Sequence, residues 1–257
     1  MSQQQLPIIP VRERDVPIIS KWTEEWLGAA HPLAYSLTIF SSPGYTKFLA
    51  YQQSVPLPRN PMRLLGAYDG DEMLGFIELR RMPDRLFINN FCVKPEARGR
   101  RIGELLLRHT EQMAESMNLS TVGLDCFLWN ERALEKYVRS GFQKTNRMHW
   151  FTGSNDRSAA EAPIQFVIEE QEKADAHQKK FGFSQFHIQT KNGQSQVNRL
   201  KDSYFRVTAE ERDPEYYNIL SQLDRCRSLF MIRADEVEMG DGWKQASTSV
   251  RLEKQIK

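Results

Sequence analysis

The sequence has only three cysteines, Cys92, Cys126 and Cys226, and no two of them form a C-x-x-C pair. An odd number of cysteines without paired spacing argues against a disulfide-bonded secreted domain. The first residues, Met-Ser-Gln-Gln-Gln, have neither the basic start nor the apolar core of a signal peptide. We therefore expect reduced thiols and a cytoplasmic location.

Long apolar runs, metal-ligand spacings and an excess of one charge are also missing from the sequence. No apolar run is long enough to span a bilayer, and the five histidines are scattered without ligand spacing. The formal net charge is only +2, which disfavours a nucleic-acid or membrane surface. The 257 residues are 40% hydrophobic, which is enough for a sizeable core in one large domain or two smaller ones.

A predicted strand, a basic loop and a predicted helix follow one another between residues 86 and 113. Apolar and β-branched residues fill positions 86–93, and apolar residues recur at helical spacing over 102–113. The loop between them contains Arg98, Arg100 and Arg101. The unpaired N–H groups and the dipole of a helix start favour an anion. The loop therefore suits a phosphate or pyrophosphate, although a solvated basic helix start remains an equal alternative.

Hydrophobic periodicity predicts alternating strands and helices on both sides of this loop. The small, polar residues 152–163 have the composition of a linker, so we predict two domains, 1–155 and 163–257. The second is predicted to be a smaller α+β domain of unknown role, and no internal repeat is visible. The predicted strands of the first domain cover 7–11, 63–68, 73–79, 86–93, 121–127 and 142–151, with helices from Asp15, Tyr45 and Asn130. Those of the second cover 164–168, 186–190, 204–208, 229–232 and 247–252, with helices at 169–180 and from Pro214.

Three segments resemble motifs of the GNAT family of N-acetyltransferases, which use acetyl-coenzyme A. They are Val-Lys-Pro-Glu-Ala-Arg-Gly-Arg-Arg-Ile-Gly (93–103), Leu-Asp-Cys-Phe-Leu-Trp-Asn (124–130) and Ala-Leu-Glu-Lys-Tyr-Val-Arg-Ser-Gly-Phe (133–142). The resemblance covers residues 63–151 and implies an α/β fold for 1–155, with a mixed, mostly antiparallel sheet flanked by helices. The family loop commonly reads Gln/Arg-x-x-Gly-x-Gly/Ala, and Arg101 stands at its inner glycine. We expect Arg101 to have helical dihedrals and to offer its N–H to a phosphate.

The resemblance also implies roles for individual residues. Tyr137 is the expected acid for the leaving thiolate, and Asp125 and Glu78 are rival candidates for the base. The alternative interpretations are a core aromatic for Tyr137, an ion-paired strand residue for Asp125 and an exposed strand position for Glu78. We interpret Cys92 and Cys126 as small apolar residues rather than covalent acyl carriers. The expected cofactor-binding residues are Phe91, Cys92, Val93, Arg98, Gly99, Arg100, Arg101, Ile102, Gly103, Asn130 and Tyr137.

The implied reaction is direct transfer of an acetyl group from acetyl-coenzyme A, as cosubstrate, to a primary amine of an unidentified small molecule or protein. The alternative is a non-catalytic acyl-coenzyme A sensor or interaction protein. No metal, nucleic acid or membrane partner is expected. Residues 28–61 would line the acceptor side by analogy with the family. A homodimer is left open for the chain.

Overall fold

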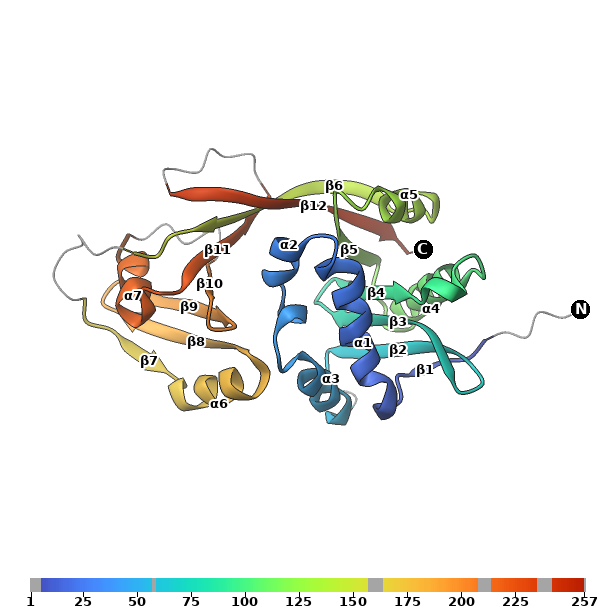
Figure 1. Ribbon diagram of the computed structural model, residues 1–257, viewed down its shortest axis with the longest axis horizontal. Coiled ribbons are helices and arrows are strands. Elements are labelled where there is room, and N and C mark those ends of the chain that lie inside the picture. Colours follow the sequence, from blue (N-terminus) through green and yellow to red (C-terminus); the bar gives the residue numbers. More distant parts are fainter. Residues whose placement is uncertain (1–5, 57–58, 157–163, 208–213, 235–241, 257) are drawn as a thin grey trace, which may run out of the picture. The chain divides into compact units, whose positions relative to one another are not determined.

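The computed structural model describes residues 6–56, 59–156, 164–207, 214–234 and 242–256 (Figure 1). Internal contacts divide the chain into two compact units. The first unit comprises Met1–Trp26, Phe48–Arg147 and Ser249–Lys257, and the second comprises Leu27–Lys47 and Met148–Thr248. The two units are therefore interleaved in sequence. No helix among the described residues is long and apolar enough to cross a membrane.

The first unit is built on a mixed sheet in the order β1-β2-β3-β4-β5-β12. Every neighbouring pair is antiparallel except β4 and β5, which are parallel. This confirms the expected mixed, mostly antiparallel sheet with helices. The elements are β1 (Ile8–Pro10), α1 (Val16–Thr23), α3 (Tyr45–Ser54), β2 (Met62–Asp69), β3 (Glu72–Arg81), β4 (Arg85–Val93), α4 (Ile102–Ser116), β5 (Thr121–Phe127), α5 (Glu131–Arg139), and parts of β6 (Gln143–Gly153) and β12 (Trp243–Gln255).

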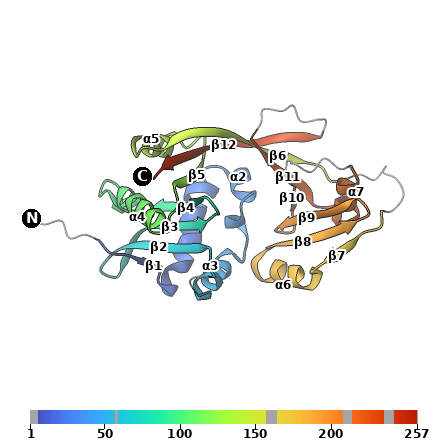
Figure 2. The same ribbon diagram turned by 180° about the vertical axis from the view of Figure 1, so that it is seen from behind.

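Helices cover both faces of this sheet. Figure 1 shows α1 in front of the strands, and the reverse view in Figure 2 shows α4 over the opposite face. On the α1 face, Trp22 stacks against Phe76 of β3 with ring centroids 6.2 Å apart. On the α4 face, Ile102 and Leu106 approach β3 so closely that a Cβ added at Gly75 would lie 3.3–3.4 Å from them. The alternation of side chains along β3 therefore separates the two faces.

The strands of the second unit are ordered β6-β11-β10-β9-β8-β7, again with parallel and antiparallel neighbours. Here β10 and β11 are the parallel pair. Buried residues of α6 and α7 pack on the strands, among them Ala174, Ile219 and Leu220. Its elements are α2 (Pro32–Ser36), β7 (Val167–Glu169), α6 (Gln171–Phe181), β8 (Phe183–Thr190), β9 (Gly193–Leu200), β10 (Tyr204–Val207), α7 (Pro214–Asp224), β11 (Ser228–Arg233), and the remaining parts of β6 and β12.

The end of β12 completes the sheet of the first unit. It pairs with β5 from Ser249↔Phe127 to Gln255↔Thr121, so residues 249–255 belong with the first unit although they follow the second in sequence. Residues 27–47 lie in the second unit, where a Cβ added at Gly44 would come within 2.4 Å of the backbone of Phe181. The two compact units therefore have other bounds than the domains predicted from the sequence, 1–155 and 163–257. That residues 1–155 fold independently stays a prediction.

Candidate active site

The parallel strands β4 and β5 separate before they end. Their pairing runs from Arg85↔Thr121 to Ile88↔Leu124, whereas β4 continues to Val93 and β5 to Phe127. Residues 90–93 of β4 still pair with β3 on their other side. On the side that faces β5, however, their backbone groups lie outside the β4–β5 ladder. A ligand with its own amide groups could therefore hydrogen-bond to this strand edge.

A β-bulge brings polar side chains to this part of β4. The β3–β4 register shifts between Glu78 and Leu79, so that Glu78 pairs with Asn90 and Leu79 with Ile88. The extra residue is Asn89, and a bulge of this kind redirects a side chain. Asn89 Nδ2 donates a 2.7 Å hydrogen bond to Glu78 Oε1. The alternative interpretation of Glu78 was an exposed strand position. In the structure Glu78 is 0% exposed.

Glu78 lies on the α1 face of the sheet. Phe76, two residues earlier in β3, contacts Trp22 of α1, and residues two apart in a strand share a face. Asn90, the cross-strand partner of Glu78, also reaches α1. The Nδ2 of Asn90 donates a 2.9 Å hydrogen bond to Thr23 Oγ1. A buried carboxylate and a buried amide therefore face α1 beside the separated strands.

The loop between β4 and α4 has the left-handed geometry of an anion-binding turn. Gly99 has φ +86° and Arg101, the N-cap of α4, has φ 59° and ψ 20°. The expectation that Arg101 would be helical is therefore wrong. Left-handed backbone is costly for a residue with a Cβ and free for glycine, which explains why the family pattern has glycine at this position. In this chain the left-handed position is occupied by an arginine.

The start of α4 offers donors without a side-chain cap. Among the described residues, no side chain hydrogen-bonds the N-terminus of α4 at its N-cap, so its first N–H groups are available to an anion. The side chain of Arg98 is exposed, whereas Arg100 Nη2 is 2.8 Å from Asp69 Oδ2. A Cβ at Gly103 would lie 3.3 Å from the Phe91 ring, so this position suits a residue without a side chain.

Asn130 precedes the first residue of α5, and Tyr137 lies in the second half of this helix. Asn130 is the N-cap of α5, where its Oδ1 accepts a 3.3 Å hydrogen bond from the N–H of Ala133. The Tyr137 ring packs against Phe91 of β4 and Phe142, with centroids 6.4 and 5.8 Å away. Burial raises the pKa of Tyr137 above its usual value, with smaller contributions from Cys126 and Cys92. The phenol is therefore protonated at neutral pH, beside the separated part of β4.

The two cysteines near this site are poor nucleophiles. Burial raises the pKa of Cys92 to about 11, although the nearby Arg98 acts in the opposite direction. Burial, followed by the charge of Asp125, raises the pKa of Cys126 to about 12. Since a thiolate is the reactive form of cysteine, both side chains are unreactive at neutral pH.

Asp125 is engaged in an ion pair on the surface of β5. Its two carboxylate oxygens accept hydrogen bonds from Arg251 of β12, one of them at 2.9 Å from Nη2. The Arg251 guanidinium also lies over the Phe87 ring, 5.1 Å from its centroid. This bidentate pairing agrees with the alternative interpretation of Asp125 as an ion-paired strand residue.

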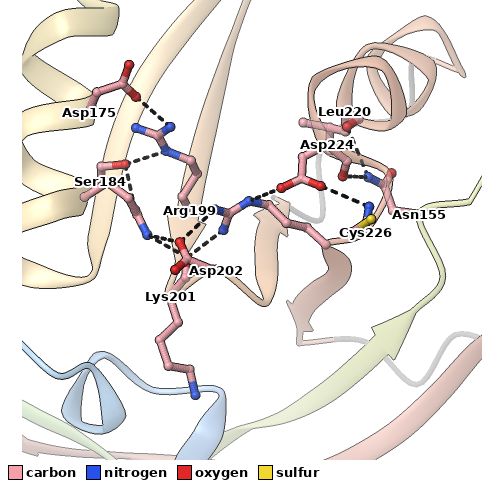
Figure 3. A network of polar contacts seen from close by, with 11 residues as sticks. Asn155, Asp175, Ser184, Arg199, Lys201, Asp202, Leu220, Asp224 and Cys226 are labelled. Atoms are coloured by element: carbon pink, nitrogen blue, oxygen red, sulfur yellow. Dashed lines mark hydrogen bonds and ion pairs between the residues drawn. The ribbon is translucent and has the colours of Figure 1, made fainter.

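A second polar network lies in the second unit, and its geometry indicates a structural role (Figure 3). Arg227 is 8% exposed and donates to the carbonyl of Lys201 at 2.6 Å and to carboxylates of Asp224 and Asp202 at 3.0 and 3.2 Å. These bonds fasten the end of α7 to the turn between β9 and β10. Among the described residues, no group of three or more His, Cys, Asp or Glu side chains could hold a metal ion.

The sequence analysis missed three polar residues of the first unit: Thr23, Asn89 and Asn90. The only local signal was the pair of asparagines inside an otherwise apolar strand. Asn is disfavoured in strands, so two in succession indicate a bulge or a functional position. Thr23 gave no signal, because its partner lies 67 residues away in sequence.

Comparisons with known proteins place this geometry in context. Residues 23–142 match the model of the Acetyltransferase (GNAT) family. The chain is similar in fold to a tandem GNAT protein from the clavulanic acid biosynthesis pathway, with 13% identity and a TM-score of 0.63 over 98% of this chain and 99% of that one. It is also similar to a GCN5-related N-acetyltransferase from Sphaerobacter thermophilus, with 14% identity and a TM-score of 0.59 over 100% and 98% of the two chains. No curated protein matches the sequence.

Proposed function

We propose, from the match of residues 23–142 to the Acetyltransferase (GNAT) family model, that this chain transfers an acetyl group from acetyl-coenzyme A to a primary amine by direct attack. The observation that carries the proposal is the opening of the sheet beyond Ile88↔Leu124. It lies beside the uncapped, left-handed start of α4. Together they offer an extended strand edge and an anion site, which are the two features that a pantetheine arm and a pyrophosphate need.

The residues fit coenzyme A in their chemistry. The N–H groups around Gly99 to Gly103 would hold the pyrophosphate, with Arg98 supplying charge. Backbone groups of Phe91, Cys92 and Val93 would pair with the pantetheine amides, because that edge of β4 lies outside the β4–β5 ladder. Asn130 already uses Oδ1 to cap α5, which leaves its amide nitrogen to donate. When bound, acetyl-coenzyme A supplies the thioester carbonyl that an amine attacks.

We assign the base to Glu78 in preference to Asp125. Glu78 is fully buried on the α1 face beside the separated strands, where a carboxylate can take a proton from a bound amine. Both oxygens of Asp125 already accept hydrogen bonds from Arg251, so this carboxylate is engaged in a structural contact. The geometry therefore favours Glu78 as the proton acceptor.

We assign the acid to Tyr137, on the opposite face of the sheet. Its raised pKa keeps the phenol protonated, and its ring contacts Phe91 in the separated part of β4. Proton removal and proton donation would thus occur on the two faces, and the gap between β4 and β5 connects them. This separation keeps the base from taking the proton that the acid must give.

A non-catalytic acyl-coenzyme A sensor is the second candidate function. It would share the cofactor site but would have no need for a buried carboxylate or a protonated phenol beside the separated strands. The presence of Glu78 and Tyr137 at that place therefore favours the enzyme.

Calorimetry followed by a turnover assay tests both functions. We expect one acetyl-coenzyme A per chain, with a dissociation constant on the order of 1 μM to 1 mM, the range typical of enzyme substrates. Thiol release with a panel of primary amines should then exceed the rate without amine. Saturable binding without amine-dependent thiol release would support the sensor, and absence of binding would overturn the cofactor site itself.

A further inference from the structure

A buried amide beside the proposed base has an unpaired carbonyl oxygen. Asn90 is 4% exposed, and its Nδ2 donates to Thr23 Oγ1 at 2.9 Å. Its Oδ1 is buried and has no hydrogen-bond partner among the described residues. A buried acceptor without a hydrogen bond destabilises the folded state, so the retention of this one in the core needs an explanation.

The hydrogen-bond pattern fixes which way this amide points. Thr23 Oγ1 is 2.7 Å from the carbonyl oxygen of Ile19, to which only its hydroxyl hydrogen can donate. The Thr23 oxygen must therefore accept from Asn90, and this requires the NH₂ group of the amide on that side. The Asn90 carbonyl oxygen consequently faces away from α1 residue Thr23. A flipped amide would set two acceptors against each other.

Asn90 is also directly opposite Glu78. The two residues are cross-strand partners in the β3–β4 ladder, and the Cβ atoms of such partners lie roughly 4.5–5.5 Å apart on the same face. Both are in the part of the sheet where β4 has separated from β5. An oriented acceptor and a carboxylate therefore flank the position at which an amine would meet the thioester.

We propose that Asn90 Oδ1 accepts a hydrogen bond from one N–H of the acceptor amine and thereby selects primary over secondary amines, with Thr23 as its positioning residue. The inference rests on the proposed acetyl transfer. A neutral primary amine has two N–H groups and one lone pair. One N–H pairs with Asn90, the other faces Glu78, and the lone pair faces the carbonyl carbon.

The step balances with the groups named above. The amine nitrogen forms the new C–N bond and loses one proton to Glu78. The C–S bond breaks with its electron pair on sulfur, which takes the proton of Tyr137. The N–H held by Asn90 is retained in the product amide. A secondary amine has a single N–H, which cannot serve Asn90 and Glu78 together.

The test compares matched amines on matched variants. The probes are phenethylamine with N-methylphenethylamine and butylamine with N-methylbutylamine, assayed by thiol release from acetyl-coenzyme A. The wild type should prefer each primary amine by about 10- to 100-fold in kcat/KM, as expected for one buried hydrogen bond. Asn90→Leu keeps the branching at Cγ without the polar atoms and should bring this ratio close to one. Thr23→Val should lower the ratio, and Thr23→Ser, which keeps the hydroxyl, should restore it.

Two further readouts separate this role from a structural one. The KM for acetyl-coenzyme A should stay unchanged in all variants. The double variant Thr23→Val/Asn90→Leu should unfold at or above the wild-type temperature, because replacing both polar partners by apolar groups of similar shape is nearly neutral. A ratio that is the same in wild type and Asn90→Leu overturns the inference and leaves acetyl transfer standing.

Binding measurements distinguish failure of the reaction from failure of the site. Saturation-transfer NMR on the coenzyme A complex reports binding of the same four amines without chemistry. A primary-amine preference in binding that Asn90→Leu removes supports the inference, even when thiol release shows no turnover. Equal binding of primary and secondary amines, or no binding of any of the four, overturns it.

Discussion

The two units have the same strand and helix order but different chemistry at the corresponding place. Apart from α2 and α3, the first runs β1, α1, β2, β3, β4, α4 and β5, and the second runs β7, α6, β8, β9, β10, α7 and β11. Each has one parallel pair, β4–β5 or β10–β11. In the first unit the pair separates after Ile88↔Leu124. In the second, β10 pairs with β11 from Tyr204↔Ser228 to Val207↔Met231, and the residues that follow Val207 lie outside the described part of the chain.

The segments that follow the two parallel strands also differ. After β4 the chain carries Arg98, Arg100 and Arg101, whereas residues 208–213 after β10 read Thr-Ala-Glu-Glu-Arg-Asp, a mainly acidic stretch that lies outside the described residues. A mainly acidic segment at this place does not suit a phosphorylated ligand. The comparison indicates that a repeated fold carries a phosphate site only where the loop after the parallel strand is basic. The predictions below test this contrast, from the largest effect to the smallest.

The largest effect is expected from removal of one phenolic hydroxyl in each unit. Tyr137→Phe should lower kcat by about 10²–10⁴ with little change in coenzyme A affinity, because it removes a positioned acid. Tyr216→Phe is the matched control, since its hydroxyl donates to Gln196 O at 2.9 Å in the second unit. It should cost about 1 kcal/mol of stability and leave kcat unchanged. Wild-type turnover in Tyr137→Phe would remove the acid from the mechanism.

Thiol reactivity should differ by at least about 10² between the units. At pH 8 a thiol with the pKa of Cys92, about 11, has far less thiolate than a free thiol with pKa about 8.5. Iodoacetamide labelling followed by mass spectrometry should therefore modify the exposed Cys226 first and Cys92 and Cys126 last. All three should react alike in urea. Rapid labelling of Cys92 in the folded chain would restore a covalent acyl carrier as an alternative.

Charge reversal at the basic loop should weaken coenzyme A binding by about 10- to 100-fold. Arg98→Glu replaces a charge-assisted contact to phosphate by repulsion. Arg206 is exposed in the second unit, and the Arg206→Glu variant should bind coenzyme A as the wild type does. Added salt should weaken the wild type and partly restore the Arg98 variant, since both effects are screened. Calorimetry at two ionic strengths gives the comparison. Equal affinities for the two variants would contradict the assignment of the loop.

The smallest effect concerns two left-handed residues, Arg101 with φ 59° and Lys201 with φ 50°. Arg101→Gly and Lys201→Gly should each stabilise the chain by about 1 kcal/mol or less, because relief of strain exceeds the added freedom of the unfolded state. Thermal unfolding measures this difference. Arg101→Ala is the control, since it removes the charge but keeps the strain. Equal stabilisation by Ala and Gly would attribute the gain to charge instead.

The sequence was informative where the signals are local. The strand, basic loop and helix around residues 86–113, the N-cap Asn130 and the helix face of Tyr137 all depend on neighbours in sequence, and the helices and strands there agree with the structure. The strand β9 was missed, because Gly-Gln-Ser-Gln-Val-Asn-Arg-Leu is mainly polar and only Val197 and Leu200 of it are buried. A half-exposed strand of this kind gives little hydrophobic periodicity.

The features that depend on distant residues could not be read from the sequence. The left-handed Arg101 contradicts the usual preference of arginine, and closure of the turn imposes it. The Asn90–Thr23 bond and the Asp125–Arg251 pair join segments 67 and 126 residues apart. The repetition of the fold was equally invisible, because it lies in the order and pairing of strands rather than in similar residues.

The pairing of β12 with β5 has a consequence for the biosynthesis of the chain. Residues 249–255 complete the first sheet, while β6, which directly follows α5, pairs with β11 of the second. On the ribosome, the strands of the first unit are made before those of the second, but the partner of β5 is synthesised after both. The edge of β5 must therefore stay unpaired, or pair transiently, until synthesis has passed Gln255. An exposed edge of this kind is prone to non-native pairing, so the nascent chain should be most dependent on chaperones in that interval.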